Sequence, residues 1–286
     1  MSMNHASPFT RLQFAPSPSA LDPALLQAPT KFRCASVWRH ERPLLDVLIE
    51  EYGTVSLRDL TGTYGWCIRY SQQHKSEDLG IETLGELLDL FRQGSEQALP
   101  YLMHLSLHRN LPRLRRYFVD PPQFRPNWVA APWADRIGGP ELFVGQKGTG
   151  FGPVHIDHVS VHVGFYQLSG QKRFLLFPPD DGQYLYRYPG AEFPWQLRNS
   201  QVRGFDEGLH ERYPLLRHAS PREITLRAGE ALFMPANWWH TTLNLSDSVS
   251  YSVRIVNRSN ALSTLAEYAR GVPRALSRAF AGDRRG

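Results

Sequence analysis

The sequence has few cysteines and no long apolar run. Cys34 and Cys67 are the two cysteines in 286 residues; they are too few for a disulfide framework, and their spacing fits no zinc pattern. We expect both to be small core residues of a protein in the reducing cytoplasm. No apolar run approaches the roughly 20 residues that a membrane span requires. The first residues also lack the charged flank and apolar core of a secretory signal, so no association with a membrane is expected.

The chain has only a small excess of positive charge. Lysine and arginine together number 32 against 27 acidic residues, a formal net charge of +5. Part of the excess is clustered, as at Arg113, Arg115 and Arg116. No segment interleaves basic and aromatic residues in the manner of an RNA-binding surface. A solvated basic face is the simpler interpretation, and binding of nucleic acid is the alternative.

The first third of the chain predicts helices after an arm rich in proline. Residues 1–30 contain five of the 22 prolines and little charge, so we expect a poorly ordered N-terminal arm. A short helix is predicted from Pro43, since Leu44, Val47 and Leu48 share one face. We also predict a strand at 64–70 and a second amphipathic helix, with apolar residues at helical spacing over 84–91 and Gly94 at its end.

The second half of the chain predicts a β structure. Short segments rich in branched and aromatic residues are bounded by Gly, Pro, Asp or Ser, which is typical of a sandwich or barrel. They lie at 141–147, 161–169, 172–178, 222–227, 230–235 and 248–256. An irregular insertion with many aromatic residues is expected between 180 and 221, and two short helices at 261–270 and 273–281. No linker separates the halves, so we expect one domain over 31–286 with its β-barrel core at about 140–256 and its C-terminal helices within 260–282.

Three side chains are candidates for a transition-metal site. His155 and Asp157 are two residues apart, so on a strand they would project from the same face. The pair alone means little, because 11 histidines and 27 acidic residues in 286 produce about one such pattern by chance. His240 follows an apolar strand and a turn, and it would complete a facial triad of two histidines and one carboxylate, the Fe(II) site of many oxygenases. Two unrelated histidines are the alternative.

Lys172 and Tyr101 are candidates for binding an organic acid beside that metal. Lys172 begins an otherwise apolar strand, and an ammonium group deep in a barrel could hold the distal carboxylate of a chelating 2-oxo acid. The alternative is a lysine that only flanks a turn. Tyr101 could donate its phenol to the same carboxylate, although the local sequence also suits a tyrosine packed in the core.

Four motifs occur in the order and at the spacing found in the JmjC and cupin-like 2-oxoglutarate oxygenases. They are residues 155–157, 170–180, 185–189 and 228–240. The chain resembles in particular the asparaginyl hydroxylase branch that contains factor inhibiting hypoxia-inducible factor, and its pattern is also similar to that of the tRNA wybutosine hydroxylase. The resemblance is strong over about 140–256; upstream, residues 99–102 look like the Tyr-Leu motif of the family.

This resemblance implies a mainly β protein with a double-stranded β-helix (jelly-roll or cupin) core, flanked by N-terminal helices and short C-terminal helices. It implies iron on His155, Asp157 and His240, and 2-oxoglutarate as co-substrate, with its C5 carboxylate on Lys172 and Tyr101. Dioxygen would then be used to convert 2-oxoglutarate to succinate and CO2 while the substrate is hydroxylated. A homodimer through the C-terminal helices is a further implication; the alternative is that their apolar stripes pack on the barrel.

The chain departs from the family pattern at three places. Gly152 stands where relatives have a threonine that contacts the co-substrate. Two extra residues lie between the metal carboxylate and Lys172, and Val163, with His162 beside it, stands near a family asparagine. Arg254 stands roughly at a second asparagine; pointing inward it could bind a carboxylate of the co-substrate, and pointing outward it would be a surface charge. His162 suits a buried, hydrogen-bonded histidine better than a ligand.

The sequence therefore favours an Fe(II)- and 2-oxoglutarate-dependent oxygenase that hydroxylates an amino-acid side chain of a protein or peptide, with demethylation as a variant of the same chemistry. The same chemistry on RNA or a small metabolite is one alternative. A non-catalytic cupin-type metal-binding protein is another, and the altered positions at Gly152, Val163 and Arg254 motivate it.

Overall fold

The structure is a computed structural model. The structure describes residues 10–11, 26–63, 80–129, 139–188, 198–204 and 208–269. The strand expected at 64–70 and the helix expected at 273–281 lie outside the described residues. No helix in the described part of the chain is both long and apolar enough to cross a membrane.

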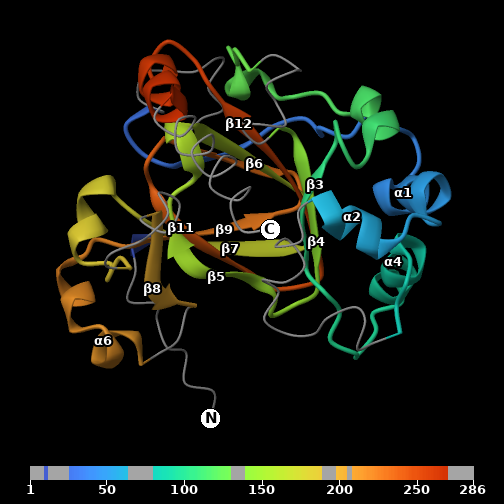
Figure 1. Ribbon diagram of the computed structural model, residues 1–286, viewed down its shortest axis with the longest axis horizontal. Helices are drawn as coiled ribbons and strands as arrows, with labels where there is room; N and C mark the ends of the chain where they lie inside the picture. Colours follow the sequence, from blue (N-terminus) through green and yellow to red (C-terminus); the bar gives the residue numbers. More distant parts are fainter. Residues whose placement is uncertain are drawn as a thin grey trace, which may run out of the picture.

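Two six-stranded sheets face each other and form the barrel (Figure 1). The first sheet has the order β1 (Thr10–Arg11), β9 (Arg222–Arg227), β7 (Gln171–Phe177), β11 (Trp239–Asn244), β5 (Gly150–His155) and β8 (Asn199–Arg203). The second has the order β2 (Thr30–Arg33), β10 (Glu230–Met234), β6 (His162–Ser169), β12 (Ser248–Ile255), β4 (Glu141–Gly145) and β3 (Leu102–Ser106). All pairs are antiparallel except that of β1 with β9. The predicted mainly β fold, a double-stranded β-helix, is confirmed.

The strands alternate between an apolar outer face and a partly polar interior. On β12, Val249, Tyr251, Val253 and Ile255 belong to the large apolar cluster that also contains the N-terminal helices. Because successive side chains of a strand point to opposite faces, the intervening serines and Arg254 face the interior, and all eight residues of β12 are buried. The period-two pattern at 248–255 therefore marks a strand that is buried on both sides, with its polar side inward.

Three helices of the N-terminal part cover the outer face of the second sheet at β3 and β4 (Figure 1). They are α1 (Leu44–Tyr52), α2 (Leu57–Thr63) and α4 (Leu84–Arg92). The predicted helices at Pro43 and 84–91 correspond to α1 and α4. Helix α4 begins with a capping box, in which Thr83 accepts from the backbone N–H of Glu86 and the Glu86 carboxylate accepts from that of Thr83.

The segment expected to be irregular, 180–221, contains defined elements on the opposite side of the barrel (Figure 1). They are β8, the short helix α6 (Leu209–Arg212) and 3-10 turns at Pro179–Gln183 and Pro214–His218. Strand β8 pairs with β5, so the insertion extends the first sheet beside the strand that ends at His155. Its short strand, with the sequence NSQVR, carries too little apolar pattern to be recognised locally.

The two chain ends contribute regular structure next to the barrel. Within the predicted arm, Thr10–Arg11 pairs with β9, and Thr30–Arg33 pairs with β10. Near the other end, a helix at 261–269 follows β12, as predicted. The division into an arm and one domain remains a prediction.

Candidate metal centre

The three predicted metal ligands meet inside the barrel. His155 is the last residue of β5, and His240, the second residue of β11, is its direct partner across the two strands. Asp157 does not lie on the strand as expected; it follows the strand's end in an extended conformation. One ligand atom from each of the three residues lies within 4.8 Å of the others, which is the spacing of a single coordinated ion.

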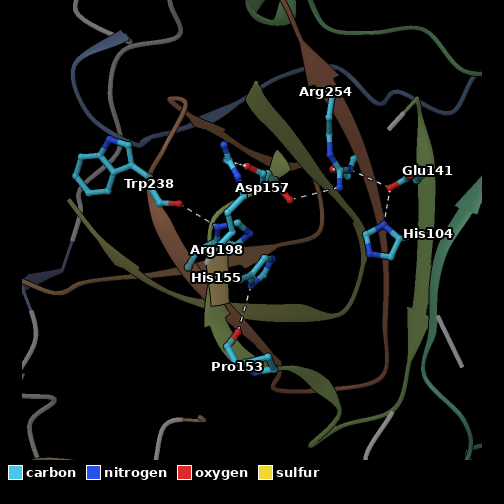
Figure 2. Close-up of polar contacts among 10 residues, drawn as sticks. His104, Glu141, Pro153, His155, Asp157, Arg198, Trp238 and Arg254 are labelled. Atoms are coloured by element: carbon cyan, nitrogen blue, oxygen red, sulfur yellow. Dashed lines mark hydrogen bonds and ion pairs between the residues drawn. The ribbon is translucent and has the colours of Figure 1, made fainter. Parts of the chain in front are cut away.

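Both histidines are oriented in the same way by the backbone. The Nδ1 atom of His155 donates to the carbonyl of Pro153 (3.2 Å), and that of His240 donates to the carbonyl of Trp238 (3.3 Å) (Figure 2). A carbonyl oxygen can only accept, so each ring carries its proton on Nδ1. The lone pair of each Nε2 is then available to a metal, the usual arrangement of a metal-binding histidine.

The electrostatics of the three side chains match the donor set that a divalent cation needs. Burial is the main cause that lowers the pKa of His155 and of His240. Because both pKa values lie below the usual value of histidine, both rings are neutral at pH 7. Burial alone would raise the pKa of Asp157, but the positive charge of Arg254 beside it holds that pKa below its usual value. Two neutral imidazoles and one carboxylate are therefore present across the neutral range.

One buried oxygen of this site has no partner within the described residues. Asp157 Oδ2 is shielded from solvent and accepts no hydrogen bond, and an unpaired carboxylate oxygen inside a protein is costly. A cation on the three ligands would satisfy this oxygen. The residues present therefore fit an Fe(II) ion.

Lys172 and Tyr101 also meet inside the barrel. The ammonium of Lys172 donates to the phenol oxygen of Tyr101 (3.1 Å) and lies 5.3 Å from the ring centre of Phe143. Both side chains are almost fully buried. A Cβ at Gly145 would come within 2.3 Å of the Tyr101 ring, so only glycine at this position leaves room for the tyrosine.

No carboxylate pairs with the Lys172 ammonium among the described residues. Burial alone lowers the pKa of Lys172 to about 7, and burial raises that of Tyr101. An unpaired ammonium in an apolar site is unfavourable unless an anion joins it. The geometry thus provides a cation and a phenol for a ligand carboxylate at this end of the barrel.

Arg254 points inward, as one of the two alternatives predicted. Its Nη1 donates to Glu141 Oε2 (2.9 Å), and its Nη2 lies 3.6 Å from Asp157 Oδ1 (Figure 2). Sequence reasoning missed Glu141 and its second partner His104. A glutamate at the first position of an otherwise apolar strand was the only signal that could have suggested Glu141.

At the other positions that depart from the family pattern, the residues contact neighbouring parts of the barrel. Val163 is fully buried in an apolar cluster of the barrel. His162 accepts at Nδ1 from the backbone N–H of Ala236 and is 2.9 Å at Nε2 from the hydroxyl of Ser259, and burial lowers its pKa to about 4. His162 is therefore a buried, hydrogen-bonded histidine and not a metal ligand, as predicted. Gly152 accepts at its carbonyl from the backbone N–H of Gly204.

The loop after Asp157 is held by two distant segments. Arg198, just before β8, donates to the carbonyl of Asp157 (2.7 Å) and pairs with Glu267 of the C-terminal helix. Glu267 also accepts from the hydroxyl of Ser160 (2.6 Å). Val159 and Ser160 adopt left-handed backbone angles, with φ of 56° and 48°, which is unusual for residues other than glycine. These contacts fix the turn that follows the metal carboxylate.

The basic cluster at 113–116 has structural partners. Arg113 lies over the ring of Tyr52 and pairs with Glu51, and Arg116 lies over the ring of Tyr117. Arg115 donates to the carbonyl of Phe118 (2.7 Å). These contacts favour the solvated basic face over a nucleic-acid surface.

Of the two cysteines, Cys34 is half-buried against the large core cluster and is a free cysteine, as predicted. Cys67 lies outside the described residues.

Curated proteins with similar sequences include one that is named as an oxygenase and one that is named as a demethylase. The chain is 27% identical to the human 2-oxoglutarate and iron-dependent oxygenase JMJD4 over 228 residues, which are 77% of the chain and 51% of that protein. It is 32% identical to human HSPB1-associated protein 1 over 114 residues (39% of the chain, 22% of the relative). The arginine-specific demethylase JMJ22 of Arabidopsis thaliana is 27% identical over 181 residues (61% and 34%).

The chain spans about half the length of these relatives or less. None of the three is named as an asparaginyl hydroxylase, so the predicted closeness to that branch remains a prediction. The model of one protein family covers residues 19–255, from within the N-terminal arm to the last residue of β12. With the barrel and its two-histidine, one-carboxylate centre, this match shows that the chain belongs to the cupin-like domain family.

Proposed function

We propose that this protein is an Fe(II)- and 2-oxoglutarate-dependent oxygenase that hydroxylates an amino-acid side chain of a protein or peptide. The observation that carries the proposal is the pairing of two sites in one barrel. A facial triad with an unpaired carboxylate oxygen is present, and so is a buried ammonium without an anionic partner among the described residues. The names of the relatives JMJD4 and JMJ22 support the same chemistry.

The two sites lie along the same pair of neighbouring strands, β7 and β11. In the register of the two strands, Lys172 of β7 lies opposite Asn244 of β11, which is four residues beyond His240. Four residues of a strand correspond to roughly 13 Å between Cα atoms, a separation that the dicarboxylate and the side chains of the two sites would span together. Phe151 lies between them, since its ring centre is 4.1 Å from that of His155 and its side chain packs on the cluster of Tyr101 and Phe143.

Each residue would have a defined part. His155, Asp157 and His240 would hold iron, which when bound supplies the activation of dioxygen. Lys172 and Tyr101 would bind the C5 carboxylate of 2-oxoglutarate and so orient its 2-oxo acid end toward the metal. Arg254, next to the metal carboxylate, is within the region that this chelating end would occupy, and it would contribute positive charge there. The buried barrel would exclude water from the reacting atoms.

The substrate class is proposed from the segments that border the barrel. A protein or peptide side chain is proposed because the insertion at 180–221 and the N-terminal part border the barrel opposite each other (Figure 1). Removal of an N-methyl group by hydroxylation is a second candidate, supported by the similarity to the arginine-specific demethylase JMJ22. Mass spectrometry of candidate peptides separates the two, because one product gains an oxygen atom and the other loses a methyl group.

A calorimetric titration with N-oxalylglycine, an inert analogue of 2-oxoglutarate, tests the cofactor assignment. Protein loaded with Mn(II) or Zn(II) should bind the analogue, and the metal-free protein should bind it at least tenfold more weakly. Binding that is independent of metal would favour a non-catalytic cupin.

A cytoplasmic location belongs to the same proposal and follows from the low cysteine content.

Affinity for the analogue should depend on pH through Lys172. The pKa of Lys172 is lowered to about 7 by burial, so the ammonium is charged below pH 7 and loses its proton as the pH rises. In metal-saturated protein, affinity for N-oxalylglycine should be highest below pH 7 and fall above it, by up to about tenfold per pH unit. Tyr101, with a raised pKa, stays protonated over this range. A Lys172→Met variant should bind weakly with no such dependence, and a flat profile in the native chain would remove Lys172 from the site.

We also propose that the C-terminal helix mediates a homodimer. Leu262 and Leu265 on the helix at 261–269 are 83% and 64% exposed, so they do not pack on the barrel. Sedimentation or light scattering of the native chain should give a dimer, and a Leu262→Glu, Leu265→Glu variant a monomer with an unchanged circular dichroism spectrum. A native chain that is monomeric at micromolar concentration would contradict this.

A further inference from the structure

A chain of buried polar side chains runs from the second sheet to the metal carboxylate (Figure 2). His104 of β3 donates from Nδ1 to Glu141 Oε2 (2.8 Å), and Glu141 is the first residue of β4. The same oxygen accepts from Nη1 of Arg254 on β12 (2.9 Å). The other end of the guanidinium faces Asp157 Oδ1 at 3.6 Å. Since β3, β4 and β12 are neighbours in one sheet, the first three residues form a connected unit.

We propose that Arg254 is a positioning residue for the metal carboxylate, and that Glu141 and His104 make this role possible. Arg254 would hold Asp157 by its Oδ1 and so direct Oδ2, the oxygen without a partner, toward the metal. Glu141 would fix the guanidinium and neutralise its charge, and His104 would fix Glu141. The inference rests on the proposed metal site and adds three residues to it.

The two distances at Arg254 indicate that Glu141 holds the guanidinium and that the guanidinium orients Asp157. The guanidinium is hydrogen-bonded to Glu141 at 2.9 Å, but it remains at ion-pair distance, 3.6 Å, from Asp157. A closer, two-pronged pair with Asp157 would occupy both carboxylate oxygens and compete with a cation. Glu141 therefore keeps Arg254 close enough to orient Asp157 and too far to engage it completely.

The charges also balance only when Glu141 is present. A guanidinium beside a divalent cation is repelled by it, and both lie inside the barrel where screening by water is weak. Glu141 adds one negative charge next to the guanidinium, so that the negative charge of Asp157 remains for the metal. Arg254 and Glu141 therefore act as a matched pair, and either one alone would leave an uncompensated buried charge.

The backbone at His104 adds an independent indication. His104 lies within β3 but has a φ of 57°, a left-handed conformation that is unfavourable for a side chain with a Cβ. The pairing of β3 with β4 is shifted between Leu102 and Leu105, so the strand bulges at this residue. The bulge brings the imidazole to Glu141 and against the ring of Phe143, at 5.0 Å between ring centres. Strained residues of this kind are typical of functional sites.

Co(II) binding to matched variants tests the proposal without requiring activity. Glu141→Gln should leave the guanidinium free to move onto Asp157 and should weaken Co(II) binding at least tenfold, with a changed visible absorption spectrum. Arg254→Asn should also weaken binding at least tenfold. The double variant should bind Co(II) about as weakly as Arg254→Asn alone, because Glu141 acts on Asp157 only through Arg254. Full affinity in both single variants, or a double variant with the product of the two losses, would overturn the proposal.

A second buried ion pair provides the control for folding. Lys31 and Glu230 pair at 2.8 Å between β2 and β10, and both are buried. Glu230→Gln should lower the unfolding temperature as Glu141→Gln does but leave Co(II) affinity unchanged. A loss of affinity in Glu230→Gln as large as that in Glu141→Gln would assign the effect to general destabilisation and refute the positioning role. If Glu141→Gln does not fold, His104→Asn takes its place in the experiment. This variant is expected to weaken Co(II) binding by threefold or more.

The readouts separate this inference from the proposed function. If the native chain binds no Co(II) at the three ligands, the proposed function itself fails. If the native chain binds Co(II) and the Arg254 variant loses affinity only for N-oxalylglycine at saturating metal, Arg254 contacts the co-substrate alone and the positioning role is refuted. The expected result is a loss that is largest for the metal.

Discussion

The Lys172→Met variant is expected to unfold at a higher temperature than the native chain and to lose its affinity for N-oxalylglycine. The folded-state pKa of about 7, compared with the ordinary lysine pKa of 10.5, means that the buried ammonium costs roughly 5 kcal/mol of folding free energy below pH 7. Methionine has a similar length and no charge to bury. Part of the gain is lost because the Tyr101 hydroxyl loses its donor, so a net stabilisation of about 2 kcal/mol is expected.

The pH dependence of this stabilisation has a definite sign. Between pH 7 and 10.5 the unfolded lysine binds a proton that the folded one has lost, so the native chain gains stability relative to the variant as the pH rises. Thermal unfolding at pH 6.5 and 9.5 measures the difference, which should be larger at pH 6.5. A variant less stable than the native chain at pH 6.5 would contradict a buried, unpaired ammonium.

Lys31 is the matched control for this experiment. It is also buried, but its ammonium pairs with Glu230 (2.8 Å) and donates to the carbonyl of Thr225 (2.7 Å). Lys31→Met should therefore destabilise the protein, by about 3 kcal/mol, because it removes the buried cation that pairs with the buried Glu230 carboxylate. Two buried lysines with opposite responses to the same substitution would distinguish a ligand-binding cation from a structural one.

His240→Ala is expected to abolish metal binding and with it the stabilisation that metal provides. A ligand at 100 times its dissociation constant stabilises a folded protein by about 2.7 kcal/mol. Co(II) should therefore raise the unfolding temperature of the native chain by several degrees and leave that of the variant unchanged. The loss of one of three ligands leaves His155 and Asp157, too few to hold the ion.

His162→Ala serves as the comparison for His240→Ala. His162 is equally buried, but it is held by Ala236 and Ser259 and belongs to no metal-ligand group among the described residues. The variant should be less stable than the native chain and should still be stabilised by Co(II). A loss of the Co(II) effect in both variants would indicate that the metal binds elsewhere or that the barrel has been disrupted.

The sequence was sufficient to select the candidate ligands that the structure brings together, because each belongs to a local motif. His155 and Asp157 lie together, His240 follows an apolar strand, and Lys172 interrupts an apolar strand at its start. The helices at Pro43 and 84–91 and six of the nine described strands after residue 140 follow from periodicity and turn residues in the same way. These features are local, so no knowledge of the fold is needed to find them.

The remaining parts depend on contacts between distant segments. The alternation of β12 predicts a strand but not which face is inward; the covering helices α1 and α4 decide that, and they send Arg254 into the barrel. The pairing of Arg254 with Glu141 joins residues 113 positions apart, and Arg198 with Glu267 joins residues 69 apart. Strand β8 was missed because its few residues pair with β5 without an apolar pattern of their own.

Conversion of 2-oxoglutarate to succinate by the purified, iron-loaded protein tests the central claim most directly. The account predicts succinate formation that requires iron and dioxygen, is stimulated by a substrate pool of proteins or peptides, and is absent in the His240→Ala variant. No consumption of 2-oxoglutarate with any substrate pool, by protein that binds iron and is folded, would contradict it.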